Sequence, residues 1–195
     1  MYEIVFIMGK SSSGKDSIYK KLKEDDKLCL TNVVLYTTRP RRDGETDGVE
    51  YNFVTDEKEQ EMEKLNKIIE LRCYNTAYGV WKYFTADDGQ IDLNSGSRYI
   101  VIGTLEAYEQ FISYFGKEHI LPIYIEVDDR IRLQRAIDRE NQQKSPKYIE
   151  LCRRFLADDK DFGEDKLKQA GIVKRFSNNG NIEDCINMIK KEILK

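Results

Sequence analysis

The stretch that decides the fold of this chain is Ile4-Val5-Phe6-Ile7-Met8-Gly9-Lys10-Ser11-Ser12-Ser13-Gly14-Lys15. Its first five residues are apolar and predict a buried strand, and the chain is expected to turn helical at about Lys15. Gly9 and Gly14 bound a loop whose successive backbone N–H groups are suited to surround phosphate oxygens, with the helix N-terminus adding partial positive charge. A serine-rich surface turn is the alternative, which the order of strand, loop and lysine disfavours.

We call residues 9–15 the phosphate loop. Lys15 is expected to reach the outer phosphates of a nucleoside triphosphate. The next residue in such loops is normally a Ser or Thr that contacts Mg²⁺, but here it is Asp16, followed by Ser17. A carboxylate beside a triphosphate is repelled unless Mg²⁺ lies between them, so Asp16 and Ser17 are the predicted metal ligands. The predicted ATP-binding residues of this region are Gly9, Ser11, Ser12, Ser13, Gly14, Lys15, Asp16 and Ser17.

The size and composition favour one globular domain. A chain of 195 residues with 40% hydrophobic residues is long enough to bury a core. The formal net charge of −3 argues against a nucleic-acid partner, which would require a basic face. No apolar run approaches the ~18 residues that span a bilayer, and the N-terminus leads into a core strand without room for a signal peptide.

The cysteine pattern predicts a reducing compartment. The four cysteines lie far apart without CxxC spacing, and together with the single histidine they form no plausible zinc set. We therefore expect reduced thiols in a soluble cytoplasmic protein that binds neither membrane nor nucleic acid. The oligomeric state is not predicted.

Strand and helix patterns alternate along most of the chain. Apolar runs at residues 2–8, 99–102 and 121–127 predict strands, and residues 171–173 predict a short last strand. Helical spacing of apolar residues occurs at Ile18 and Leu22, at Leu105, Tyr108, Ile112 and Phe115, at Ile131, Leu133 and Ile137 after a capping Asp128, and at Ile182, Cys185, Ile186, Ile189 and Ile193. The prediction is an α/β fold with three layers (α/β/α), a parallel central sheet and the phosphate site at the strand carboxyl ends.

The block at residues 32–84 breaks this alternation and is predicted to be a small inserted lobe. It contains short β-prone segments at residues 33–38 and 49–55, with two Asp-Gly turn signals between them, and a polar helix starting near Asp56. A second polar patch, at residues 139–147, is a candidate lid, and a solvated loop is the alternative.

The lobe contains a second motif, Tyr36-Thr37-Thr38-Arg39-Pro40-Arg41-Arg42-Asp43-Gly44-Glu45, followed by Asp47-Gly48-Val49-Glu50-Tyr51-Asn52-Phe53-Val54. Here the chain resembles the guanylate kinases. Their signature is Thr-Thr-Arg, two variable residues, Arg, one variable residue and Gly-Glu, then Gly, two variable residues, Tyr, one variable residue and Phe-Val. The resemblance extends from Ile4 to the last helix, and it implies one P-loop kinase domain over residues 1–195, with residues 32–84 binding the monophosphate.

The resemblance assigns the binding of the monophosphate to Arg39, Arg42 and Tyr51, with Glu45 orienting an arginine. Arginine forks pair bidentately with phosphate oxygens, so the assignment is chemically reasonable, and a solvated charged hairpin is the alternative. Tyr78 resembles a further tyrosine that contacts this phosphate.

Glu70 corresponds to the carboxylate that reads guanine in the family. Guanine presents N–H donors at N1 and at its 2-amino group, and a carboxylate accepts from both. Without the resemblance, Glu70 would be read as an ordinary surface glutamate.

Phosphoryl transfer needs positive charge around the moving group, which lid arginines supply in the family. Arg135, Arg139 and Arg154 match those positions, and the first two share a helix face because they are four residues apart. Ordinary exposed arginines are the alternative. The predicted catalytic set is Lys15, Arg39, Arg135, Arg139 and Arg154. Asn178 matches the stretch near the adenine of ATP and is added to the ATP-binding residues.

Four departures from the family pattern bear on activity. Asp16 replaces the metal-binding hydroxyl, Leu35 replaces a serine that helps to read the base, and Val80 replaces a Ser or Thr with the same task. Ile102 and Thr104 replace two strand aspartates, and Thr104 is counted with the monophosphate site. The loss of two hydroxyls that read the base predicts relaxed or redirected base discrimination.

The resemblance implies ATP-dependent phosphoryl transfer to a nucleoside monophosphate, with GMP or dGMP as the favoured acceptor and Mg²⁺ as the partner of ATP. Two alternatives stay open: a catalytically impaired binding or regulatory module, favoured by the missing aspartates, and a kinase for another nucleotide. The presence of Lys15 favours the kinase.

Overall fold

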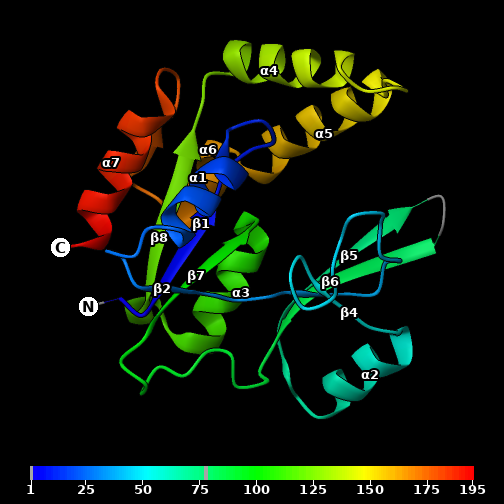
Figure 1. Ribbon diagram of the computed structural model, residues 1–195, viewed down its shortest axis with the longest axis vertical. Coiled ribbons are helices and arrows are strands. Elements are labelled where there is room, and N and C mark those ends of the chain that lie inside the picture. The colour runs from blue at the N-terminus through cyan, green and yellow to red at the C-terminus, as the bar shows by residue number, and fades with distance from the viewer. Residues whose placement is uncertain (1, 77–78) are drawn as a thin grey trace.

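The chain forms a parallel central sheet with helices on both faces, and a smaller lobe projects from one side (Figure 1). The computed structural model describes residues 2–76 and 79–195. The five central strands lie in the order β2-β7-β1-β8-β9, and every neighbouring pair is parallel. Their bounds are Leu30–Asn32 (β2), Arg98–Gly103 (β7), Ile4–Met8 (β1), Ile120–Glu126 (β8) and Arg175–Ser177 (β9). The predicted α/β fold is confirmed.

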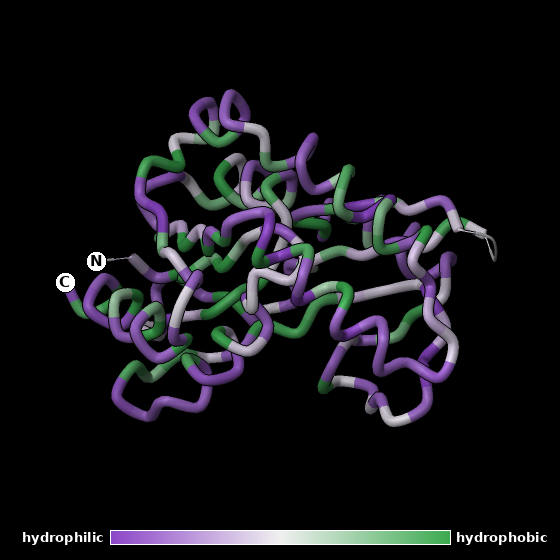
Figure 2. The backbone as a smooth tube through the Cα atoms, turned by 90° about the horizontal axis from the view of Figure 1, so that it is seen from above, coloured by the Kyte–Doolittle hydropathy of each residue, from purple (hydrophilic) through white to green (hydrophobic). Residues whose placement is uncertain are grey.

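The central strand β1 is buried on both faces, which explains why all five of its residues are apolar. Ile4, Phe6 and Met8 point into one core, and Val5 and Ile7 point into the other, as the two-residue period of a strand requires. Phe6 packs edge-on against Phe111 of a covering helix, with ring centroids 5.1 Å apart. In Figure 2 the hydrophobic segments lie inside this larger part of the molecule and hydrophilic segments form its outer loops.

Helices cover both faces of the sheet. One face is covered by α1 (Lys15–Lys23) and α7 (Ile182–Ile193), and the other by α3 (Leu105–Phe115) and α6 (Glu164–Gln169). A 3₁₀ turn, η1 (Lys117–His119), leads into β8. The apolar stripe predicted for the last helix is confirmed, since Cys185, Ile186, Ile189 and Ile193 are buried.

The lobe is built on a second sheet, with strands in the order β4-β3-β6-β5. Its long hairpin pairs β5 (Ile68–Thr76) with β6 (Gly79–Ala86), while β3 (Tyr36–Thr37) and β4 (Asn52–Phe53) are short and parallel. The polar helix expected near Asp56 is α2 (Asp56–Lys64), which Thr55 caps by accepting a hydrogen bond from the N–H of Lys58. Met62, Phe84 and Ala86 form the core of the lobe.

Two helices, α4 (Asp129–Asn141) and α5 (Tyr148–Asp161), project from the same side of the central sheet as the lobe (Figure 1). The candidate lid at residues 139–147 comprises the end of α4 and the turn that leads to α5. The helix predicted after Asp128 is present as α4, but the predicted apolar residues do not form its buried face. Its buried residues are Arg132, Ala136 and Glu140. The apolar side chains of the predicted helix are only half-buried: Ile131, Leu133 and Ile137.

The strand predicted at residues 171–173 is also wrong, because these residues close α6 instead. Gly171 has a φ of +75°, and the N–H of Ile172 returns to the carbonyl of Leu167 at 2.8 Å. This is the pattern in which a glycine in the left-handed region ends a helix. Val173 then lies 86% exposed, and the last strand starts two residues later.

Two smaller predictions are corrected. The β-prone segments at residues 33–38 and 49–55 contain strands of only two residues each. Asp128 precedes α4, but its carboxylate makes no capping hydrogen bond. Across the two described ranges, no helix combines the length and apolar character needed to cross a membrane.

The burial of α7 predicts a contrast between two adjacent residues. Ile189→Ala should lower the free energy of unfolding by about 2–5 kcal/mol, because Ile189 is fully buried and its loss leaves a cavity. Met188→Ala is the control, since Met188 is 44% exposed, and it should cost about 0.5 kcal/mol or less. Urea unfolding measures both values, and equal effects would show that α7 is not docked as described.

Candidate active site

The phosphate loop follows β1 at the carboxyl end of the sheet, and α1 starts at Lys15. Both predicted glycines are required by close approach. A Cβ on Gly9 would lie 2.7 Å from the carbonyl oxygen of Ile125, and one on Gly14 would lie 2.6 Å from Nδ2 of Asn178. Gly14 also has a φ of +84°, which favours glycine. The loop is therefore held tightly between β8 and the segment after β9.

Two hydroxyl groups of the loop point to an anionic ligand. The Oγ atoms of Ser12 and Ser13 are buried and have no hydrogen-bond partner in the part of the chain that the structure describes. Buried polar atoms are normally paired, so such groups at a helix N-terminus suit phosphate oxygens. The first-turn N–H groups of α1 lack intrahelical partners by the geometry of any helix. The residues present thus fit a phosphate group.

Lys15 and Asp16 lie beside this loop. The Nζ of Lys15 is 3.7 Å from a carboxylate oxygen of Asp16, whose side chain is 83% exposed. Ser17 is also exposed. Both predicted metal ligands are therefore accessible from solvent at the edge of the loop.

A buried ion pair fastens the lid helices to the phosphate loop. Arg132 is 1% exposed, and its Nη1 donates to Oδ2 of Asp158 at 3.0 Å. The same oxygen accepts from the N–H of Ser11 at 2.9 Å. The guanidinium of Arg132 stacks on the ring of Phe155 and donates to Asp129 at 2.8 Å. This network connects α4, α5 and the loop in one cluster.

Arg132 and Asp158 were not predicted from the sequence. Arginine at position 132 reads as a solvated side chain, and only the four-residue spacing to Ala136 and Glu140 hints at a common face. A second ion pair between the loop and α5 was also not predicted. It joins Nζ of Lys10 to Oδ1 of Asp159 at 2.7 Å.

The predicted lid arginines lie on two sides of the loop. Arg139 and Arg154 line a narrow cleft together with Ser11 and Ser12. Arg135 does not line this cleft, and its Nη2 donates to the carbonyl of Asn178 at 3.0 Å.

Asn178 forms a buried hydrogen bond with the phosphate loop. It is 2% exposed, and its Nδ2 donates to the carbonyl of Ser13 at 2.8 Å. One of its two amide N–H groups is therefore committed to the protein, whereas its Oδ1 is buried without a hydrogen-bond partner among the described residues, which leaves this oxygen available for the predicted contact with the nucleotide.

In the lobe, Arg39 and Glu45 form a bidentate ion pair with N–O distances of 2.7 and 2.6 Å. Arg39 is 4% exposed, and its guanidinium lies against the rings of Tyr51 and Phe53. Glu45 also accepts from the N–H of Arg42 at 2.8 Å. This geometry agrees with the expectation that Glu45 orients an arginine. The hydrogen bonds from Arg39, with that of Arg42, lower the pKa of Glu45 to about 2.

Glu70 lies inside the lobe and not on its surface. It is 1% exposed, so it is no surface glutamate, and its carboxylate accepts from Arg72 and from Thr85. Thr104 caps α3 by accepting from the N–H of Ala107. Tyr78 lies outside the described residues.

A cavity of about 220 Å³ lies between the central sheet and the lobe. Its lining includes Tyr51, Arg72 and two of the replaced family positions, Leu35 and Ile102. Val80, the other replaced base-reading position, is 49% exposed on β6.

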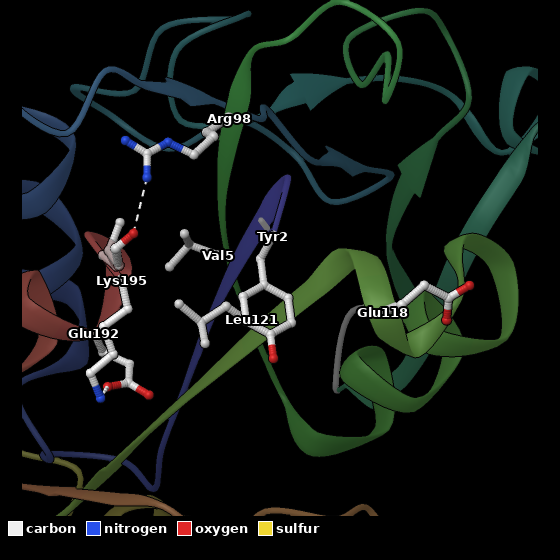
Figure 3. Close-up of a pocket in the computed structure, with 8 residues that line it drawn as sticks. Tyr2, Val5, Arg98, Glu118, Leu121, Glu192 and Lys195 are labelled. Carbon is white, nitrogen blue, oxygen red and sulfur yellow. Dashed lines mark hydrogen bonds and ion pairs between the residues drawn. The ribbon is translucent and has the colours of Figure 1, made fainter.

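A different cavity, of about 570 Å³, opens at the amino ends of the central strands (Figure 3). Val5 and Leu121 form its apolar wall, and Arg98 donates to the carbonyl of Ile193 at its edge. This cavity lies at the opposite end of the strands from the phosphate loop, and none of the predicted catalytic residues lines it.

Comparisons with known proteins agree on one family. The family model described as guanylate kinase matches residues 1–158. A guanylate kinase of Mycoplasma mobile is 31% identical, covering 98% of this chain and 94% of that protein. A guanylate kinase of Clostridioides difficile is 40% identical over 40% of this chain and 38% of its own length. The crystal structure of guanylate kinase from Anaplasma phagocytophilum superposes with a TM-score of 0.65 at 19% identity, covering 99% of this chain and 85% of that one, which shows a common fold.

The Arg132–Asp158 pair predicts non-additive stability changes. Asp158→Ala should cost about 3 kcal/mol because it removes a partner from a buried charge. The double variant Arg132→Leu/Asp158→Ala should cost less than the sum of the single variants Arg132→Leu and Asp158→Ala, since it removes the buried guanidinium together with its buried partner. Urea unfolding tests both, with the exposed pair Arg153 and Glu150 as the control. A double variant whose loss equals the sum of the two single losses would contradict the pairing.

The lowered pKa of Glu45 predicts a pH-dependent contribution to stability. Because its pKa falls from 4.5 to about 2, the ion pair stabilises the fold fully above about pH 4.5 and loses this effect as the pH falls towards 2. Glu45→Gln should therefore be less stable than the parent at neutral pH, with a difference that vanishes in acid. Unfolding at a series of pH values measures this, and exposed Glu63→Gln is the control. A difference that stays constant down to about pH 2 would rule out the linkage.

Proposed function

The chain belongs to the guanylate kinase family, and from this premise we propose that it transfers a phosphoryl group from ATP to a nucleoside monophosphate, with GMP or dGMP as the favoured acceptor. The observation that carries the proposal is the phosphate loop, which combines a helix N-terminus, Lys15 and two buried hydroxyls that have no partner among the described residues. Arg139 and Arg154 of the lid helices line a cleft beside this loop. These groups match the charge of a triphosphate.

The residues would act by positioning and by neutralising charge. Lys15 would contact the outer phosphates of ATP, and Arg135, Arg139 and Arg154 would approach the moving group from the lid. Arg39, Arg42 and Tyr51 would hold the acceptor phosphate, with Glu45 fixing Arg39 as observed. Preorganised donors of this kind stabilise the transition state because they need not reorient during the reaction. Closure of the lid and lobe would exclude water.

Mg²⁺ would be held by Asp16 and Ser17. Both side chains are exposed beside the loop, and Mg²⁺ is usually bound by one or two protein oxygens together with phosphates. When bound, the ion supplies positive charge that offsets the charge of the phosphates. Asp16 would thus provide a carboxylate in a site from which the two strand aspartates are missing.

A binding or regulatory module is the second candidate. Ile102 lines the acceptor cavity where the family has an aspartate, which favours loss of catalysis with retention of binding. The two candidates differ in turnover.

We expect Mg·ATP and GMP to yield ADP at a rate that falls by about 10²–10³-fold in Lys15→Ala, because a charge-stabilising donor is lost. Lys20→Ala is the matched control, since Lys20 lies on the same helix with its side chain 75% exposed. A panel of nucleoside monophosphates tests the acceptor. Absence of ADP with every acceptor, together with a rise in Tm on addition of ATP, would favour the binding module.

A further inference from the structure

Glu70 and Arg72 form a buried ion pair inside the lobe. Both lie on β5 two residues apart, so their side chains share one face of the strand. The Nε of Arg72 donates to Oε2 of Glu70 at 2.9 Å, and its Nη2 donates to Oε1 at 3.1 Å. Thr85 on the neighbouring strand donates to Oε1 at 2.9 Å. Glu70 is 1% exposed and Arg72 is 9% exposed.

This pairing occupies the carboxylate that was expected to read guanine. Each oxygen of Glu70 already accepts a charge-assisted hydrogen bond. With the bond from Thr85, the carboxylate accepts three hydrogen bonds and has about one acceptor site left, whereas the N1–H and 2-amino groups of guanine need two. To accept both, Glu70 would have to release a present partner, and releasing Arg72 would leave a guanidinium unpaired in the interior, which is strongly unfavourable.

The cavity between the sheet and the lobe presents Arg72 and not Glu70. Its lining includes Asn32, Leu35, Tyr51, Arg72 and Ile102. A guanidinium has five N–H donors and no acceptor, and Glu70 takes only two of them. Leu35 offers no hydroxyl. Among the described residues that line this cavity, the buried polar side chain is Arg72, which can only donate hydrogen bonds.

The cavity also contains one carboxylate, that of Glu50, which does not substitute for Glu70. Glu50 is exposed, and its carboxylate already accepts from the N–H of Thr46 at 2.7 Å. A hydrogen bond made in water discriminates weakly between ligands, because water competes for the same groups.

We propose that Arg72 sets the base specificity of the acceptor site: it withdraws Glu70 from the base and selects nucleoside monophosphates by the acceptor atoms of the base. This rests on the proposed function, since it takes the cavity as the acceptor site. A guanidinium donates to carbonyl oxygens and ring nitrogens but cannot accept from an amino group. Guanine and hypoxanthine share O6 and N7 and differ only in the 2-amino group, so the site should treat GMP and IMP alike.

Titration calorimetry of the full chain with GMP and with IMP, without ATP, tests this proposal. The two Kd values should agree within about threefold. A site that reads the 2-amino group with a buried acceptor should instead prefer GMP by about tenfold or more. A tenfold preference for GMP would overturn the proposal, as would the failure of both nucleotides to bind at millimolar concentration.

Two variants test the role of Arg72 itself. Arg72→Met should create a preference for GMP over IMP of about tenfold, because Glu70 becomes free to accept from the 2-amino group. Because this variant leaves a buried charge and can unfold, Glu70→Gln is the second test, and its ratio of Kd values should stay within about threefold of one. A tenfold loss of GMP binding in Glu70→Gln, with IMP unaffected, would show that Glu70 reads guanine. Exposed Arg153→Met is the control.

The failure of this inference differs from the failure of the proposed function. Equal binding of GMP and IMP without ADP production would remove the kinase and leave the role of Arg72 standing. ADP production with a tenfold preference for GMP in the parent chain would support the kinase and overturn the role of Arg72.

Discussion

The rest of the structure depends on one constraint, which is that β1 is apolar on both faces and yet ends in a polar loop. Because all five residues of β1 are buried, the loop begins inside the protein. Polar groups of the loop that are shielded from water must therefore form hydrogen bonds with neighbouring segments. Asp158 accepts from Ser11, and Asn178 donates to Ser13. The two hydroxyls of the loop that have no partner in the described chain, those of Ser12 and Ser13, lie at the proposed phosphate site. Packing of the sheet thus prepares the loop for an anion.

The buried arginines have a different task from the exposed ones. Arg39, Arg72 and Arg132 are each buried and each paired with a carboxylate. Such pairs are neutral units that fix geometry, and breaking one by removing a single partner is costly. Arg42 and Arg139 are exposed, which leaves their charge accessible to a nucleotide. In the lobe, Glu70 thus holds Arg72 in place, and the remaining N–H donors of Arg72 are the ones that would meet the base in the proposed acceptor site.

Local patterns were sufficient to predict the strand, loop and helix at the N-terminus and the apolar stripe of α7, since period and composition carry that information. They failed where a polar residue is buried by a distant partner. Arg132 on α4 pairs with Asp158 on α5, and its position gives no local signal of burial. The Glu70–Arg72 pair is close in sequence, but its burial depends on Thr85 and the fold of the lobe. The strand predicted at residues 171–173 is absent. Ile172 and Val173 are both apolar, but only Ile172 is buried, so the apolar run did not indicate a buried strand.

The most direct test of the account uses γ-labelled ATP with Mg²⁺ and equal concentrations of GMP and IMP in one reaction. We expect label to appear in GDP and IDP at initial rates within about threefold of each other. The loop and the arginines would catalyse the transfer, and Arg72 makes no hydrogen bond that distinguishes a base with a 2-amino group from one without it. If neither diphosphate acquired label while ATP was bound, the assignment of phosphoryl transfer to this site would be contradicted.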